Sequence, residues 1–183
     1  MPTTAADPIS VKLDHLFSTT DTDGDGYVDW SDYERIVDGC LTGYRIDRND
    51  RRAHALRAAY QMYWMEMLRH AHGSDRLDKE QFQQANRAAS MDTSRFNMVE
   101  GVPHALFDVM DTDGDNTISK AEFQRFLKVR DISDPGAMDT FTELDTDGDG
   151  EISRQEFIRA VREFFYSPDL DAPGSLLFGH PSR

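Results

Sequence analysis

Apolar residues recur at helical spacing on both sides of three short polar stretches. A phenylalanine lies four residues ahead of the first aspartate of each stretch, at Phe17, Phe107 and Phe141. An aromatic residue directly follows each stretch, and further apolar residues occupy the next helical steps; these aromatic residues are Tyr33, Phe123 and Phe157. A period near 3.6 residues predicts amphipathic helices, so each stretch is expected to be the loop of a helix–loop–helix unit.

The same periodicity predicts helices along most of the chain. Besides a long helix from an Asn49 cap to about Arg69, they cover residues 9–20, 32–42, 78–90, 103–110, 119–130, 134–144 and 153–165. Gly101-Val102-Pro103 is expected to kink or restart a helix, which leaves one helix or two open for 91–102. Ser133-Asp134-Pro135 predicts a helix start with proline in the first turn.

Acidic residues concentrate in the three polar stretches: the first loop (Asp21–Asp32), the third loop (Asp111–Glu122) and the fourth loop (Asp145–Glu156). They hold five, four and five carboxylates, or 14 of the 34 acidic residues, so the rest of the chain carries 20 acidic and 20 basic residues. The net charge of −14 therefore arises in the loops. Aspartates at positions 1, 3 and 5 of a loop repel one another unless a cation lies between them.

This spacing fits a Ca²⁺ loop, which takes oxygen ligands from positions 1, 3, 5, 7, 9 and 12, with a backbone carbonyl at position 7. Position 8 points away from the ion and is apolar, as at Val28, Ile118 and Ile152. The candidate ligands are Asp21, Asp23, Asp25, Tyr27, Asp29, Asp32, Asp111, Asp113, Asp115, Thr117, Ser119, Glu122, Asp145, Asp147, Asp149, Glu151, Ser153 and Glu156.

The three loops match the pattern D-x-[DN]-x-[DN]-G-x5-E to different degrees. The fourth loop meets every term, and the third has Asn116 in place of glycine, a mild change because asparagine tolerates positive φ. The first loop ends in Asp32, which is one methylene shorter than glutamate. We predict three Ca²⁺ sites, of which the first also accepts Mg²⁺ because a single oxygen from Asp32 suits six-fold coordination.

A second loop is predicted at His70–Gln81, where Leu77 falls at position 8 and Phe82 follows position 12. Its ligand positions hold His70, His72, Ser74, Asp78 and Gln81. These residues suit a hard oxygen-seeking ion poorly, so the second loop is expected to hold no Ca²⁺. A zinc or copper site at His70 and His72 is the alternative, although it lacks identifiable further ligands.

With these loops the chain resembles the EF-hand superfamily. A degenerate second unit, the segment Phe164-Phe165-Tyr166 and an apolar tail are similar to the sarcoplasmic calcium-binding protein group with its bacterial relative calerythrin. The resemblance implies an all-α fold of four EF-hand units in two packed pairs. It places the first pair in residues 1–92, the second in 93–166, and a tail packed on the core in 167–183. It implies a non-enzymatic Ca²⁺ buffer or signal modulator.

Other functions are weighed against this one. The same architecture resembles coelenterazine-binding proteins and photoproteins, so a carrier of a small hydrophobic ligand is an alternative, with His15, His54 and His104 as possible cavity residues. Met62, Met65 and Met67 would suit a sensor with a target groove. No nucleophile elbow, phosphate loop or HExxH motif indicates an enzyme.

Composition limits the partners and the location. The negative charge disfavours nucleic acid and anionic membranes, and Cys40 alone forms no internal disulfide. No stretch approaches a membrane span or the apolar core of a signal peptide, so we expect a cytoplasmic monomer whose protein target the sequence does not name.

Overall fold

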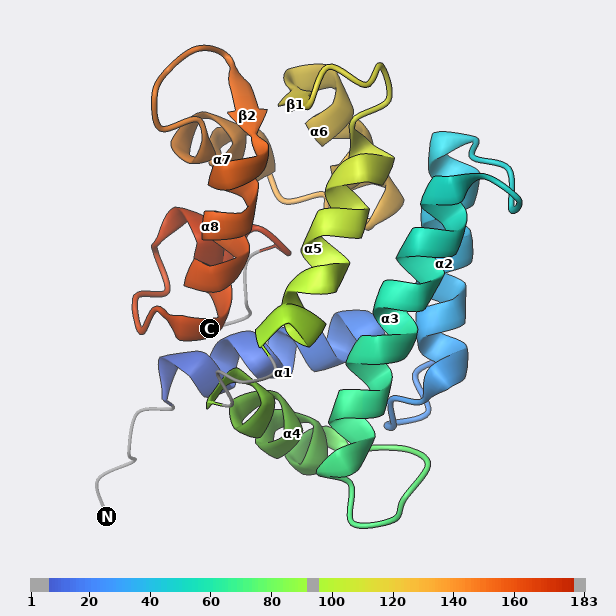
Figure 1. Ribbon diagram of the computed structural model, residues 1–183. Helices are drawn as coiled ribbons and strands as arrows, with labels where there is room; N and C mark the ends of the chain where they lie inside the picture. The colour runs from blue at the N-terminus through green and yellow to red at the C-terminus, as the bar shows by residue number, and fades with distance from the viewer. Residues whose placement is uncertain (1–6, 92–95, 180–183) are drawn as a thin grey trace.

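The computed structural model describes residues 7–91 and 96–179 and is mostly helical (Figure 1). Within that range it has eight α-helices, one 3₁₀ helix and two short strands. Their bounds are α1 Pro8–Thr20, α2 Trp30–Tyr44, α3 Arg51–Arg69, α4 Lys79–Met91, α5 Phe96–Met110, β1 Thr117–Ser119, α6 Lys120–Val129, α7 Ala137–Leu144, β2 Glu151–Ser153, α8 Arg154–Tyr166 and η2 Pro173–Leu176. The predicted all-helical class is right, and the small sheet is an addition to it.

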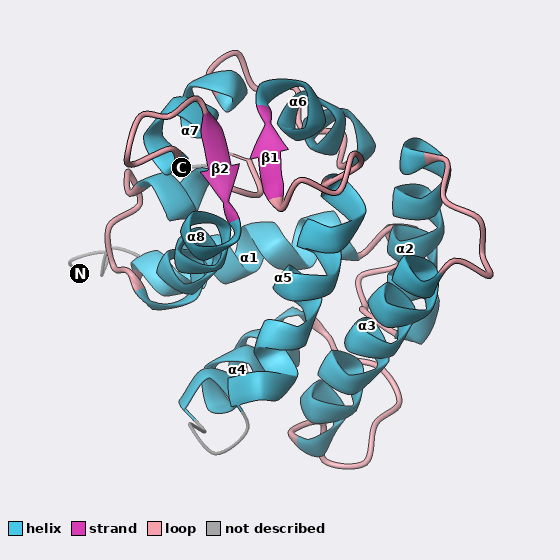
Figure 2. Ribbon diagram, turned by 45° about the horizontal axis from the view of Figure 1, so that its top comes forward, coloured by secondary structure: helices cyan, strands magenta, loops and turns pink. Residues whose placement is uncertain are grey.

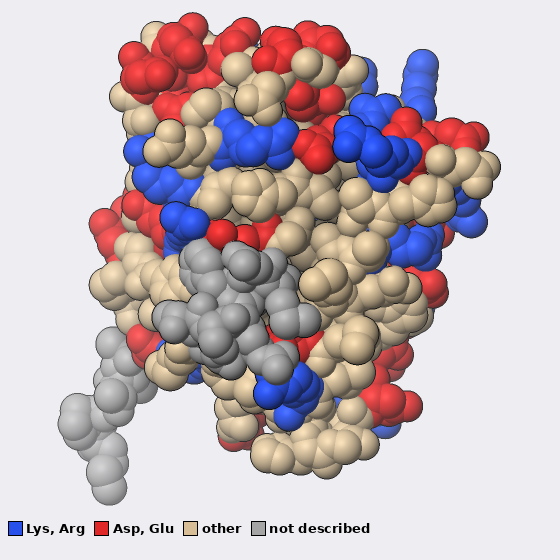
Figure 3. All heavy atoms as spheres, viewed as in Figure 1, with Lys and Arg blue, Asp and Glu red and all other residues tan. Residues whose placement is uncertain are grey.

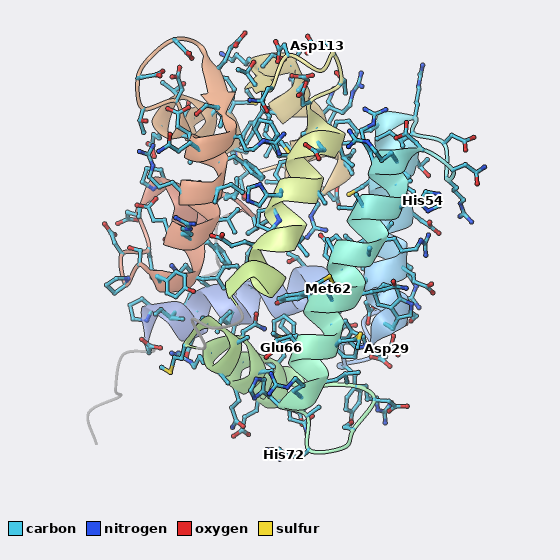
Figure 4. The ribbon with its side chains drawn as sticks, viewed as in Figure 1. Asp29, His54, Met62, Glu66, His72 and Asp113 are labelled. Carbon is cyan, nitrogen blue, oxygen red and sulfur yellow. The ribbon has the colours of Figure 1, made fainter. Side chains whose placement is uncertain are left out.

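The helices follow one another in pairs, each pair joined by one of the four loops. Strands β1 and β2 pair antiparallel, with Ile118 opposite Ile152, and so join the third and fourth loops (Figure 2). A single bridge between Val28 and Leu77 joins the first and second loops in the same way. The two joined pairs of loops lie at opposite ends of the molecule, as the positions of Asp113 and His72 show (Figure 4).

Two clusters of buried side chains form the interior, and the apolar residues at loop position 8 belong to them. The smaller cluster joins α1, α4, the start of α2 and the end of α3, and it includes Val28 and Leu77. The larger cluster joins α5 to α8 with the second half of α2 and the first half of α3, and it includes Ile118 and Ile152. All four position-8 side chains are fully buried. Helices α2 and α3 therefore tie the two clusters together.

Several predicted helix boundaries differ from the structure, among them the starts of α3, α5 and α7. Asp50, and not Asn49, caps α3, because its side chain accepts the backbone N–H of Arg52. Helix α5 begins at Phe96 and continues through Gly101 and Pro103, so of the two alternatives, a kink or a restart, the start of a separate helix at residue 103 is wrong. Helix α7 begins at Ala137, after a turn at Asp134 whose carbonyl accepts the Ala137 N–H. The predicted segment 91–102 lies partly outside the described residues.

The segment after α8 returns across the helices instead of leaving the molecule. Leu177 is fully buried in the larger cluster, and the Phe178 ring meets Phe164 edge to face at 5.0 Å. The buried Lys12 ammonium of α1 lies beneath this segment, where it donates to the carbonyls of Glu163 and Ser167 at 3.2 and 2.7 Å. These hydrogen bonds connect α1 to the C-terminal end of α8.

Candidate metal centres

The fourth loop gathers carboxylate oxygens around one point. Asp145, Asp147 and Glu156 each offer one oxygen, and these atoms all lie within 4.8 Å of one another. Oxygens in contact with one Ca²⁺ ion at about 2.3–2.6 Å lie at most about 5 Å apart, so this spacing fits the ion. The backbone N–H groups of Gly148 and Gly150 hold Asp145, donating at 2.8 Å each.

The third loop repeats this arrangement. Asp111, Asp113 and Glu122 offer oxygens within the same 4.8 Å. Asn116 adopts φ +68°, the left-handed conformation predicted for position 6, and its N–H donates to Asp111 at 2.9 Å. Acidic side chains from these two loops gather at one end of the surface (Figure 3).

The first loop differs at position 12. Its cluster consists of Asp21, Asp23 and Asp25, so the carboxylate of Asp32 is not among the gathered oxygens. Asp32 is almost fully buried and accepts the N–H groups of Thr22 and Asp29 at 2.9 Å each. The shorter side chain therefore keeps its backbone hydrogen bonds at the expense of approach to the other carboxylates.

The residue at position 12 has a structural role in all three loops. Glu122 accepts Thr112 through one oxygen and the N–H of Ser119 through the other, and Glu156 does the same with Thr146 and Ser153. The residue at position 9 caps the next helix, because Ser119, Ser153 and Asp29 each accept a backbone N–H of its first turn. The Asp29 carboxylate is thus already used as a helix cap.

Hydrogen bonds and crowding move the carboxylate pKa values in opposite directions. Desolvation raises the pKa of Glu156, but hydrogen bonds from Thr146 and Ser153 outweigh it and lower the pKa to about 2. The pKa of Glu122 is lowered for the same reasons. A backbone hydrogen bond lowers the pKa of Asp147, yet desolvation and neighbouring carboxylates outweigh it and raise the pKa. The pKa of Asp113 is raised likewise. Such crowding is relieved by a bound cation.

The remaining predicted ligands lie outside the three groups of carboxylates and make hydrogen bonds of their own. Asp115 and Asp149 each accept the backbone N–H two residues ahead, at 2.8 and 2.9 Å. The Glu151 carboxylate accepts the Thr117 hydroxyl of the neighbouring loop at 2.7 Å. Tyr27, at position 7, donates its backbone N–H to Asp25 at 2.8 Å, and its ring stacks under Arg76 of the second loop.

The second loop keeps only half of this geometry. From Leu77 onward it matches the others, since Asp78 and Gln81 exchange backbone-to-side-chain hydrogen bonds of 3.0 and 2.9 Å. Before Leu77 the backbone takes another path, because positive φ occurs at positions 3 and 4, His72 and Gly73, whereas in the acidic loops it occurs at positions 4 and 6. Among the described residues, no group of three metal-ligating side chains lies here. The part of the chain that the structure describes therefore offers no third ligand for the zinc or copper alternative.

Residues chosen for the alternative functions are not brought together. His54 is exposed, as Figure 4 shows, and so is His104, while the His15 ring lies 2.9 Å from the Phe178 carbonyl. The carrier alternative therefore gains no support from these three histidines, which are absent from the lining of the apolar cavity. Met67 is buried, whereas Met62 and Met65 are 46% and 64% exposed. The three methionines therefore do not form one groove surface.

Two kinds of site residue were missed in the sequence. The threonine at position 2 holds the position-12 carboxylate in each of the three acidic loops, and its recurrence as Asp-Thr-Asp was the available signal. Arg35 of α2 contacts two carboxylates of the first loop, and nothing in the loop pattern singles it out.

Comparison with known proteins defines the class. One sequence model of an EF-hand domain pair matches residues 104–162, and a second model of an EF-hand domain pair matches residues 10–34 and 74–130. Together they span the first, third and fourth loops and part of the second. The chain belongs to the EF-hand superfamily.

Solved structures share the fold over most of their length. A calcium-binding protein of Streptomyces coelicolor is 27% identical, with a TM-score of 0.74 over 86% of this chain and 97% of its own. Coelenterazine-binding protein from Renilla muelleri, calcium-loaded and without its ligand, is 25% identical, with a TM-score of 0.68 over 96% and 98%. A sarcoplasmic calcium-binding protein from amphioxus, 17% identical with a TM-score of 0.73 over 94% and 97%, shares the fold alone.

A search of curated protein sequences gives no match. Across the described part of the chain, none of the helices has the length and apolarity that a membrane span requires.

Proposed function

We propose that this chain is a non-enzymatic Ca²⁺-binding protein with three metal sites, acting as a calcium buffer or signal modulator. The observation that carries the proposal is the convergence of three carboxylate oxygens within 4.8 Å in each of three loops. Carboxylates held so closely repel one another, and Ca²⁺, which prefers such oxygen ligands, offsets this repulsion.

The proposed ligands are the residues at positions 1, 3, 5, 7, 9 and 12 of each acidic loop. Position 12 supplies two oxygens in the third and fourth loops and one in the first, which makes the first site the most tolerant of Mg²⁺. Ca²⁺, when bound, supplies a fixed positive charge, and the protein supplies the oxygens and their orientation.

We propose that the four helix–loop–helix segments are EF-hand units in two pairs, in residues 1–92 and 93–166, with the second unit serving as a partner without metal. The bridge between Val28 and Leu77 supports this pairing. The tail 167–183 is proposed to cover the core, which the burial of Leu177 supports. We propose that the protein works as a monomer, without nucleic acid or membrane.

A buffer and an opening sensor differ in what Ca²⁺ does to the fold. Because the tail occupies apolar surface, Ca²⁺ is expected to stabilise a closed form. At 100 to 1,000 times the dissociation constant, linkage adds about 3–4 kcal/mol of stability per site. Melting curves and a hydrophobic dye, each with Ca²⁺ and with a chelator, test this. A large rise in melting temperature with constant dye binding is expected, whereas strong dye binding with an unchanged melting temperature would contradict it.

A carrier of a small aromatic ligand is the second candidate, because an apolar cavity lies between the two core clusters. Its volume is about 70 Å³, and the buried Tyr33 hydroxyl on its wall has no hydrogen-bond partner among the described residues. A cavity that holds benzene measures about 150 Å³, so a larger ligand requires the walls to move. Purified protein with visible absorbance that survives dialysis would favour the carrier; a colourless protein favours the buffer.

A further inference from the structure

The guanidinium of Arg35 lies between two carboxylates of the first loop. One nitrogen is 2.8 Å from Asp23 Oδ2, and the other is 2.9 Å from Asp32 Oδ1. The second nitrogen also donates to the Thr22 hydroxyl at 2.8 Å. The other oxygen of Asp23 accepts the N–H of Asp25, and the Asp32 side chain is 3% exposed. A planar fork of donors suits such bridging of two acceptors.

Arginine occupies the same place after all three acidic loops, but among the described residues only Arg35 pairs with carboxylates of its own loop. Arg159 follows the fourth loop and donates to the Thr146 hydroxyl at 2.7 Å. Arg125 follows the third loop and lies 5.7 Å from the centre of the Tyr44 ring. Neither of them forms an ion pair with a carboxylate of its own loop in the described residues. The ion pairs of Arg35 therefore do not follow from its position in the helix–loop–helix unit alone.

The short side chain at position 12 explains it. In the third and fourth loops the glutamate approaches the carboxylates at positions 1 and 3, whereas Asp32 stays outside the cluster of the first loop. The space between Asp23 and Asp32 is then open to a cationic side chain from α2. Arg35, one helical turn after Asp32, reaches it.

We propose that Arg35 is an internal competitor of the metal at the first site. Its guanidinium must leave Asp23 and Asp32 before both carboxylates bind a divalent ion, so the first site fills last. This rests on the proposed function and assigns the specificity of one of its sites to a residue outside the loop. No bond is made or broken in the exchange; one cation replaces another.

The first loop provides its own reporter. Tyr27 and Trp30 are the aromatic residues within it, and the third and fourth loops contain none. Tyr44 lies beside the third loop, where its hydroxyl donates to the Glu122 carbonyl at 3.3 Å, so the excitation is chosen to reach tryptophan and not tyrosine. Terbium luminescence excited through Trp30 then reports mainly on the first site, and its loss on adding Ca²⁺ gives that site's affinity. Calorimetry of the full chain counts all sites in parallel.

Three variants distinguish the two-point contact of the Arg35 guanidinium from the effect of its positive charge. Arg35→Gln removes both, and Arg35→Lys keeps the charge but loses the fork, so each is expected to raise the first-site affinity up to about fivefold. Arg159→Gln removes a matched charge beside the fourth loop, and it should change the first-site affinity less than about twofold.

Two outcomes would overturn the proposal. The first is an unchanged first-site affinity in both Arg35 variants. The second is a gain in affinity in Arg35→Gln that is absent from Arg35→Lys, because the charge of the side chain and not its two-point contact would then be responsible. If calorimetry finds no Ca²⁺ binding in the unmodified chain, the proposed function itself fails. That failure is distinct, because it also affects the third and fourth loops.

Discussion

The second and fourth loops have similar second halves and different first halves. In both, a fully buried aliphatic residue at position 8 pairs with a neighbouring loop, through Leu77 and Ile152. In both, the residues at positions 9 and 12 exchange hydrogen bonds that start the next helix. Only the fourth loop makes its turns at positions 4 and 6 and gathers three carboxylates.

The comparison separates two tasks of one motif. The second half of a loop pairs it with a neighbour and caps a helix, and Gln81 does this without a charge. The first half and the charge at position 12 supply the metal chemistry. A loop can therefore lose its metal and keep its place in the fold, which is the condition we assign to the second loop.

The largest expected effect comes from making the fourth loop like the second at position 12. Glu156→Gln should keep the cap, as Gln81 does, while removing a charged ligand. We expect Ca²⁺ affinity at the fourth loop to fall about 100-fold, or about 2.7 kcal/mol. The free energy of unfolding in chelator should fall by only about 1 kcal/mol, because the amide nitrogen cannot accept the Thr146 N–H. Calorimetry and melting curves measure both quantities. Gln81→Glu is the matched control and should create no site; an intact fourth site in Glu156→Gln would contradict the division of tasks.

The helices that leave the two loops also end differently. The Ser167 carbonyl after α8 accepts the Lys12 ammonium, whereas α4 ends at the exposed Met91. Lys12→Met leaves that half-buried acceptor without its donor and should lower the free energy of unfolding by about 2 kcal/mol in chelator. Urea titration measures this free energy. An unchanged value would show that the Lys12 hydrogen bonds do not stabilise the fold.

The same contact predicts a pH dependence. Burial lowers the pKa of Lys12 from 10.5 to about 8, an effect that nearby acidic residues oppose. Between these values the unfolded chain binds more protons than the folded one, so the Lys12 contribution to the free energy of unfolding should rise with pH and level off above them. Urea titrations from pH 8 to pH 10.5 should show this rise in the unmodified chain and lose it in Lys12→Met. A rise of equal size in both proteins would assign it to other groups.

A cap substitution tests the structural half of the second loop. Asp78→Ala removes the acceptor of the Gln81 N–H and should lower the free energy of unfolding by about 1 kcal/mol. The number of bound Ca²⁺ ions should stay the same. Chemical denaturation and calorimetry give the two quantities, and a loss of one bound ion would mean that the second loop is a metal site after all.

The smallest effect is expected from lengthening position 12 of the first loop. Asp32→Glu should bring a second oxygen toward the Asp21 cluster and raise selectivity for Ca²⁺ over Mg²⁺ about threefold. Competition titration with both ions checks it. Selectivity equal to that of the unmodified chain would contradict the account of Asp32.

The loops and their helices were predictable because metal ligands and helix-core residues recur at fixed spacings. The buried position-8 residues and the left-handed conformation of Asn116 followed directly from that pattern. The continuation of α5 through Pro103 was not predictable, because burial can compensate for one lost backbone hydrogen bond. Arg35 was missed because its partner Asp23 lies 12 residues earlier in the sequence, and Lys12 was missed because its partners lie at the other end of the chain. Spacing within a motif carries no information about such contacts.

Anomalous diffraction from crystals grown with Ca²⁺ tests the central claim most directly, because it gives both the number and the position of bound ions. The account predicts three peaks, within the first, third and fourth loops, and none within His70–Gln81. A peak in the second loop, or the absence of one from any acidic loop at saturating Ca²⁺, would contradict it.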